Sequence, residues 1–215
     1  MAPAGATLPV MTLQRTIRLA GFATLLAATS AWSAGHAQSA TAEERGHASA
    51  EAPGAGDERS VDRLLSQLAR PDQRGWQQIE QAIIREWSKS GSPAMDLLLQ
   101  RGRDALEDGD TEAALEHLTA LTDHAPDFAE GWNTRATAYF QADHYGPAMR
   151  DLARTLELEP RHFGAMIGLA TILREVGREE EALDVLRRVN EIHPHRPNVI
   201  EGIERLSAGL EGETL

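Results

Sequence analysis

The chain has 215 residues, a formal net charge of −12 and no cysteine. The acidic balance argues against a nucleic-acid binder, which needs a basic surface to replace phosphate counterions, and it disfavours adhesion to anionic lipid. The lack of cysteine excludes a disulfide framework, a thiolate metal site, an iron–sulfur cluster and a thiol nucleophile.

Residues 1–37 are predicted to be a cleaved signal peptide. Arg15 and Arg18 precede the apolar run LAGFATLLAATSAWS, and small residues follow it, which is the pattern of an export signal. The strongly apolar part is shorter than the ~20 residues that a membrane span needs. We therefore expect a periplasmic or secreted protein without a transmembrane segment after cleavage. Cleavage after Ser33 and a translation start at Met11 stay open as alternatives.

The next two segments differ sharply in apolar content. Residues 38–59 contain no large apolar side chain, so they are predicted to be a disordered linker rich in Ala, Glu and Gly. Residues 60–94 are predicted to form a diverged helical hairpin, because two apolar stripes flank a turn at Pro71. This hairpin could cover the N-terminal edge of the repeats that follow. The stripes comprise Val61, Leu64, Leu65, Leu68, Trp76, Ile79, Ile83, Ile84 and Trp87.

A repeat governs residues 95–194. Proline recurs every 34 residues, at Pro126, Pro160 and Pro194. An alanine stands twelve residues before each proline and a leucine eight before it. Within each period, two apolar blocks at helical spacing are separated by a polar break, which predicts a helix–turn–helix unit. The three units span approximately 95–128, 129–162 and 163–196.

The middle unit carries a recognisable motif. Its run WNTRATAY at residues 132–139 resembles the Trp-x-x-Leu-Gly-x-x-Tyr run of the tetratricopeptide repeat, although Arg135 replaces the usual leucine and Ala136 the glycine. The resemblance, taken with the export signal, is to an exported bacterial protein of this family. It implies an all-α, right-handed α-solenoid of helical hairpins. The periodic apolar residues after the repeats predict a capping helix at 197–210, followed by a tail at 211–215.

The family resemblance also implies a binding face. The first helix of each unit would line a concave groove, and its mixture of apolar and hydrogen-bonding side chains suits an extended peptide or an amphipathic helix. Asn133 is expected to bond a partner's backbone, since an amide both donates and accepts. Phe140 and Ile167 could instead pack beneath a neighbouring unit. The predicted groove residues are Leu99, Arg103, Leu106, Asn133, Thr137, Phe140, Gln141, Ile167, Thr171 and Arg174.

Catalytic motifs are missing from the sequence, including the HExxH zinc motif, the GxSxG nucleophile elbow and the phosphate-binding loop. We therefore predict a non-enzymatic scaffold or adaptor of the cell envelope that holds another protein and needs no cofactor or metal. One alternative is an envelope enzyme, or its accessory subunit, that uses groove carboxylates such as Glu107 and Glu130. Another is an oligomer formed through the open ends of the stack. His193 and His195 could offer imidazoles to Zn²⁺ or Cu²⁺, but a third ligand is not apparent.

Signal cleavage gives the first testable prediction. Protein recovered from the envelope fraction should begin at Gln38, because the small-residue pattern Gly-x-Ala ends at residue 37. Intact-mass measurement checks this directly. Recovery of uncut protein from the cytosol would contradict it.

Overall fold

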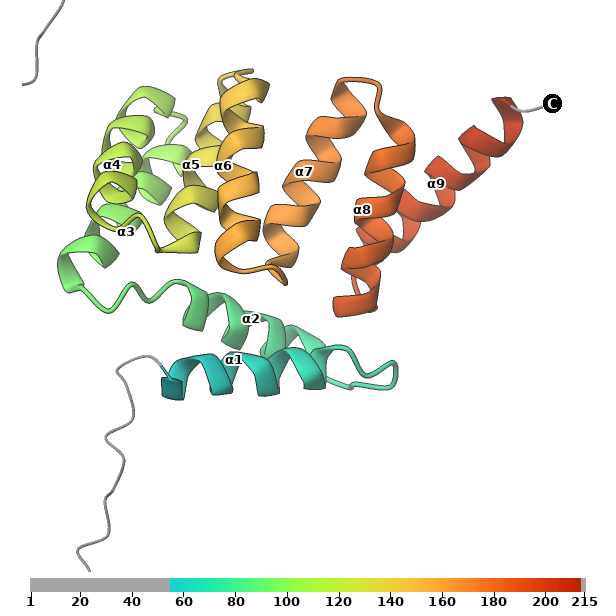
Figure 1. The fold of residues 1–215 in the computed structure, drawn as a ribbon, viewed down its shortest axis with the longest axis horizontal. Coiled ribbons are helices and arrows are strands. Elements are labelled where there is room, and N and C mark those ends of the chain that lie inside the picture. The colour runs from blue at the N-terminus through green and yellow to red at the C-terminus, as the bar shows by residue number, and fades with distance from the viewer. Residues whose placement is uncertain (1–54, 214–215) are drawn as a thin grey trace, which may run out of the picture. The chain divides into compact units, whose positions relative to one another are not determined.

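The computed structural model describes residues 55–213, and these form nine α-helices and no strand. Three antiparallel helical hairpins stand side by side (Figure 1). The fold predicted from the sequence, an all-α stack of helical hairpins, is confirmed. The predicted signal peptide and residues 38–54 of the linker lie outside the described residues. The hairpins comprise α3 (Pro93–Glu107), α4 (Thr111–His124), α5 (Ala129–Gln141), α6 (Tyr145–Leu158), α7 (Phe163–Glu175) and α8 (Glu179–Ile192).

Each hairpin turns through a residue with a left-handed backbone. Gly109 and Gly177 have φ of 75°, which glycine adopts without a steric penalty. In the middle unit Asp143 takes this place with φ of 56°, a conformation that Asp tolerates better than most residues. The cap of α4 is Asp110, whose side chain accepts the backbone N–H of Ala113 at 3.0 Å. Thr111 is the first residue of the helix.

Small residues let the two helices of a hairpin approach closely. The repeated alanines Ala114, Ala148 and Ala182 are all fully buried. Gly102 faces Leu118 so closely that an added Cβ would lie 2.6 Å from the leucine side chain. This contact explains why the same positions carry small side chains in every period.

A largely buried ion pair joins the two helices of the middle unit, and one of its residues also bonds to the first unit. Arg135, which stands where the family usually has leucine, donates to both carboxylate oxygens of Asp151 at 2.7 and 2.9 Å. It also donates to the Thr122 hydroxyl at 2.7 Å, and its guanidinium lies 4.7 Å from the centre of the Trp132 ring. Because Asp151 is only 5% exposed, the pairing satisfies a carboxylate that would otherwise be costly to bury. The motif departure therefore has a structural role: it ties α4, α5 and α6 together.

The helices at the two ends are longer than predicted. Helix α1 (Ala55–Leu68) begins five residues before the expected hairpin, so the end of the predicted linker is helical. At the other end, α9 (Pro197–Glu213) extends past the predicted residue 210 and packs on α8. No helix within the described part of the chain is long and apolar enough to cross a membrane.

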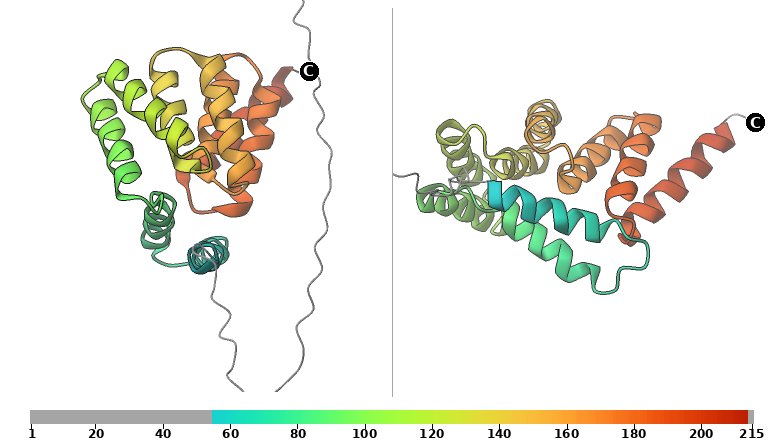
Figure 2. Two further views of the ribbon diagram at one scale, coloured as in Figure 1. Left: turned by 60° about the vertical axis from the view of Figure 1, so that its left-hand side comes forward. Right: turned by 60° about the horizontal axis from the view of Figure 1, so that its bottom comes forward.

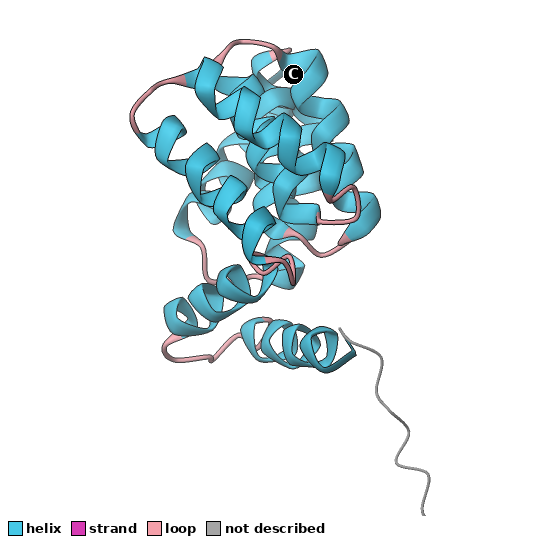
Figure 3. Ribbon diagram, turned by 90° about the vertical axis from the view of Figure 1, so that its left-hand side faces the viewer, coloured by secondary structure: helices cyan, strands magenta, loops and turns pink. Residues whose placement is uncertain are grey.

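The N-terminal hairpin of α1 and α2 (Trp76–Trp87) does not cover the first unit, contrary to expectation. Its buried residues Val61, Leu65 and Ile83 belong to the same apolar cluster as Phe163 and Met166 of α7. Figure 2 shows the hairpin lying across the edge of the stack, and Figure 3 shows the same arrangement from the side.

The side chains at the start of α7 and on the exposed side of α3 explain why the hairpin packs on the third unit. The start of α7 offers the large apolar surface of Phe163. By contrast, the exposed residues of α3 include the polar Gln100, Arg101 and Asp104, and Leu97 remains 50% exposed there. Burial of apolar area therefore favours the third unit.

Overpacking the helix–helix contact should destabilise the fold. Ala148→Leu inserts a larger side chain where no space exists, so it should lower the free energy of unfolding by about 1–3 kcal/mol. Thermal and denaturant unfolding measure the change. Arg150→Leu, on an exposed position of the same helix, is the control and should unfold like the wild type. Equal stability of both variants would show that the repeat register is wrong.

Candidate functional site

The predicted groove residues lie on the first helices of the three units, α3, α5 and α7. Their environments differ along the stack. On α3 they are mostly engaged in the core or in ion pairs, and on α7 they border an open cleft. The face formed by these helices therefore has one part whose side chains are bonded or packed within the protein, and another part that is open to solvent.

Two leucines of α3 are corrected by the structure. Leu99 is 2% exposed and belongs to the apolar core of the first unit, so it is not available to a partner. Leu106 is half-buried and packs against the same core. The first unit lacks the large aromatic residues of the motif, so these leucines are needed for packing. Helical periodicity alone does not separate this packing role from a groove role.

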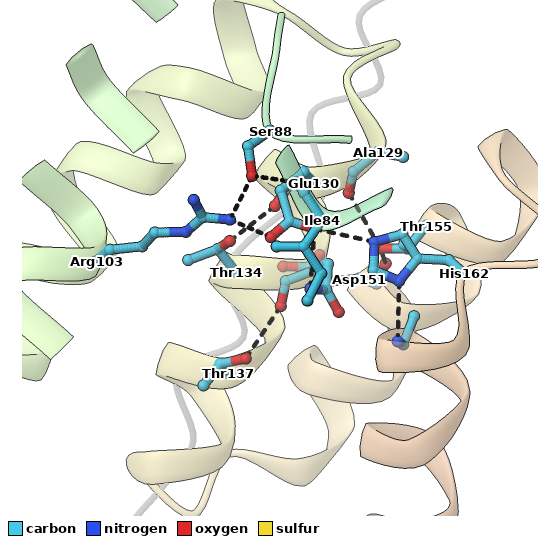
Figure 4. Close-up of polar contacts among 12 residues, drawn as sticks. Ile84, Ser88, Arg103, Ala129, Glu130, Thr134, Thr137, Asp151, Thr155 and His162 are labelled. Atoms are coloured by element: carbon cyan, nitrogen blue, oxygen red, sulfur yellow. Dashed lines mark hydrogen bonds and ion pairs between the residues drawn. The ribbon is translucent and has the colours of Figure 1, made fainter. Parts of the chain in front are cut away.

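A buried carboxylate organises the space between α3, α5 and α7. Glu130 is 7% exposed and accepts a hydrogen bond from the Arg103 guanidinium. Its second oxygen contacts His162 Nε2 at 2.9 Å and accepts a bond from the Asn133 amide at 3.2 Å. Figure 4 shows Arg103 and His162 converging on Glu130 from opposite sides. The amide of Asn133, expected to serve a partner, is thus already used within the protein.

The tautomer of His162 follows from its two bonds. Its Nδ1 accepts the backbone N–H of Ala165 at 3.1 Å and so caps α7. The other nitrogen, Nε2, must then carry the proton and donate it to Glu130. The ring also stacks on Trp87, with centroids 4.3 Å apart. His162 therefore links the start of α7 to both α5 and α2.

The end of α2 closes this part of the face. The Ser88 hydroxyl, just after α2, donates to the Ile84 carbonyl at 2.7 Å and accepts from Arg103 at 3.1 Å (Figure 4). Arg103, predicted to face a partner, is consequently bonded on both sides within the protein. This pairing could not be predicted from the sequence, because Ser88 belongs to the diverged hairpin and not to a repeat unit.

The balance of forces keeps Glu130 ionised. Burial raises the pKa of Glu130, but the hydrogen bond from His162 and the charge and bond of Arg103 outweigh burial and lower it below the ordinary 4.5. An ionised, fully bonded carboxylate is a structural group. It has neither the free proton nor the solvent access that acid–base catalysis requires.

The middle unit offers polar side chains beyond this cluster. Thr137 and Gln141 are exposed on α5, and the Thr137 hydroxyl donates to the Asn133 carbonyl at 3.2 Å. Phe140 is half-buried and lies beside Tyr145, with ring centroids 5.7 Å apart. Thr137 and Gln141 are accessible to a partner, whereas Phe140 also packs against the core of the middle unit.

The open part of the face is a cleft of about 230 Å³ between α7 and α9. Three predicted groove residues, Ile167, Thr171 and Arg174, line it together, so the structure brings the α7 set to one place. The opposite wall was not predicted. Its polar residues lie at helical spacing on α9. The amphipathic pattern of the capping helix could have predicted that they share one face. They are Asn198, Glu201 and Arg205.

Charges in this cleft are available for recognition. Among the described residues, Arg174 and Arg205 have no hydrogen-bond or ion-pair partner, and the same holds for Glu201. The apolar floor comes from Ile167, Val199 and their neighbours. A cleft of this size suits an anchor side chain of a peptide that otherwise runs along the face.

A larger cleft of about 1240 Å³ lies between the N-terminal hairpin and the turns at residues 124–129 and 158–161. Its charged groups are largely paired: Asp62 binds Arg161, and Glu86 binds Lys89. None of the predicted groove residues lines it. Within residues 55–213, no cluster of three His, Asp or Glu residues could hold a metal ion.

Comparisons with known proteins agree with this architecture. The sequence profile of the tetratricopeptide repeat matches residues 99–149 and 133–197. A TPR repeat-containing protein of Rhizobium etli is 37% identical over 155 residues, which cover 71% of this chain and 75% of that protein. The chain belongs to the tetratricopeptide repeat family.

Solved tetratricopeptide repeat structures share the fold. The first such domain of Spaghetti (RPAP3), bound to the HSP90 peptide SRMEEVD, superposes with a TM-score of 0.54 at 22% identity, covering 56% of this chain and 98% of that one. The Sgt2 domain of Aspergillus fumigatus gives 0.54 at 18% identity, covering 57% and 83%. The tetratricopeptide repeats of this chain therefore adopt the family's stacked arrangement, to which the N-terminal hairpin is added.

Loss of the Glu130 charge should show in the pH dependence of stability. Because the pKa of Glu130 is lowered in the folded protein, its contribution is present above about pH 4.5 and is lost as the pH falls below that value. Glu130→Gln should therefore be less stable than the wild type at pH 7, by roughly 1–3 kcal/mol. The gap between the two proteins should narrow between pH 5 and pH 3. Urea unfolding across this range measures the gap.

The matched control is Glu157→Gln. Glu157 forms an exposed ion pair with Arg154, which contributes little to stability. This variant should follow the wild type at every pH. A constant gap between wild type and Glu130→Gln would mean that the cluster does not depend on the ionised carboxylate.

Proposed function

We propose that this protein is a non-catalytic scaffold that binds a peptide segment of another protein on the face formed by α5, α7 and α9. The observation that carries the proposal is the open α7–α9 cleft. It combines an apolar floor with the two unpaired guanidinium groups of Arg174 and Arg205. Such a surface provides both burial for an anchor side chain and donors that fix the register of a peptide.

Membership of the tetratricopeptide repeat family supports a peptide as the ligand. The Spaghetti domain described above is bound to a peptide, and the yeast Sti1 TPR2B domain is in a complex with an Hsp70 peptide. For this chain the cleft points to peptide binding, while the identity of the partner is a separate question. Residues 1–37 carry an export signal pattern, so we infer that the partner is a protein of the cell envelope.

The arrangement disfavours the catalytic alternative. Of the two groove carboxylates considered, Glu130 is buried and fully bonded to Arg103, His162 and Asn133. Glu107 lies at the last residue of α3 and is exposed. Neither is arranged as a general acid or base beside a nucleophile, so binding without a covalent step is the function that the geometry supports.

Filling the cleft should abolish binding without unfolding the protein. Peptides can be selected on the wild-type protein from a random phage library, synthesised and measured by fluorescence anisotropy. The double variant Thr171→Tyr, Arg174→Ala fills the cleft and removes a donor, so the affinity of selected peptides should fall roughly tenfold or more. Circular dichroism should remain that of the wild type, since neither residue is fully buried.

The control is Arg187→Ala, which removes an arginine from the exposed surface of α8 and should leave affinity unchanged. A second comparison is Thr137→Tyr, which tests whether the bound peptide also crosses α5. Unchanged affinity in the cleft variant would place the binding site elsewhere and refute the proposed site.

A further inference from the structure

The turn between α8 and α9 holds the N-terminal hairpin through a buried histidine. His193 follows the last residue of α8 as its C-cap and is 0% exposed. Its ring lies edge-on to Trp76 of α2 and to Phe163 of α7, with centroids 5.2 and 5.3 Å away. Neither ring nitrogen makes a hydrogen bond within the described structure, although Nε2 lies 3.3 Å from a Glu80 oxygen. His193 therefore lies within the contact between hairpin and stack.

Two further residues of this turn complete the contact. The Arg196 guanidinium donates twice to one oxygen of Glu80, a residue of α2 that is 6% exposed. His195 contacts the Arg70 carbonyl at 2.8 Å through Nε2, and its ring stacks on Trp76 at 6.1 Å. Because a carbonyl only accepts, Nε2 of His195 carries a proton and donates it. The turn thus binds both α2 and the loop that joins α1 to α2.

We propose that the α1–α2 hairpin is an acid-sensitive latch, which protonation of His193 releases from the turn before α9. The release would uncover the start of α7, where Trp87 now covers His162 and packs against Phe163. This inference concerns the hairpin alone and does not rest on the proposed peptide site.

The charges around His193 disfavour an imidazolium. Glu80 is the one carboxylate facing the ring among the described residues, and Arg196 already engages it. Arg196 and His195 add positive charge from the same turn, while Trp76 and Phe163 contribute only apolar surface. Burial first of all, then Arg196 and His195, lower the pKa of His193 below the ordinary 6.5, although Glu80 opposes them.

The direction of the pH effect follows. In the released state water reaches His193, and the ring regains its ordinary pKa of 6.5. Docking is therefore most favourable above this pH and weakens as the pH falls through 6.5 toward the lower value of the docked ring. Between pH 7.5 and 5.5 the ratio of released to docked protein should rise by up to about tenfold.

The chain has no cysteine, so two introduced cysteines can be labelled without background. Arg63→Cys on α1 and Glu191→Cys on α8 occupy exposed positions. Single-molecule energy transfer between dyes at these positions should show a low-transfer population that grows as the pH falls from 7.5 to 5.5. The same dyes at Arg150→Cys and Glu191→Cys lie within the stack and should show no change.

The histidine variants decide which group is responsible. His193→Phe keeps an aromatic ring in an apolar pocket but does not titrate, so its hairpin should stay docked at pH 5.5. His195→Gln keeps a donor for the Arg70 carbonyl and should still open. Loss of the response in His195→Gln but not in His193→Phe would overturn the assignment, as would a wild-type hairpin that stays docked at pH 5.5.

Should His193→Phe fail to fold, ¹⁵N NMR titration of the wild-type imidazoles replaces it. Release with a midpoint that coincides with protonation of His193 supports the latch. Release that follows another histidine, or no histidine, contradicts it.

Discussion

The close approach of two helices through small residues is the constraint on which the whole structure depends. A single pair of helices buries only part of its apolar surface, so each hairpin needs a stacked neighbour to bury the rest. The fully buried Ala114, Ala148 and Ala182 set the spacing within the hairpins. Stacking then places the first helices α3, α5 and α7 side by side, and their exposed side chains become a single face.

Polar groups divide that face into two parts. Glu130 bonds both Arg103 and His162, and Ser88 after α2 accepts a further hydrogen bond from Arg103. The groups that would otherwise serve a ligand are satisfied within the chain there, as buried polar groups must be. Farther along the stack Arg174 faces α9 across an open cleft. The hairpin thus limits the part of the face that stays open, and the latch that we propose at His193 would act on that limit.

The sequence predicted the parts of the structure that depend on local pattern. The 34-residue period predicted the three hairpins, and the polar breaks predicted turns where the structure has Gly109 and Gly177. Of the predicted groove residues, Ile167, Thr171 and Arg174 do line one cleft. These results follow from the helical spacing of side chains, which fixes the face that a residue occupies.

Contacts between residues that are distant in the sequence could not be predicted from local patterns. In the sequence Arg135 is only a departure from the family motif. Its role becomes clear in the folded stack, where it bonds Asp151 and Thr122. Glu130 and His162 are both polar residues near helix starts, and only the stacking of α5 and α7 makes them partners. The hairpin is joined to α3 by a short segment, and its apolar pattern does not specify which surface of the stack it covers. Its position on the third unit was decided by Phe163 and His193, not by chain order.

The position of that hairpin is the most direct test of the account. A nitroxide on Gln77→Cys, an exposed position on α2, broadens the NMR signals of nearby amides at neutral pH. The account predicts broadening of the turn at residues 193–196 and sharp signals from residues 97–101 on the outer side of α3. Broadening of α3 with a sharp 193–196 turn would place the hairpin on the first unit and contradict the division of the binding face.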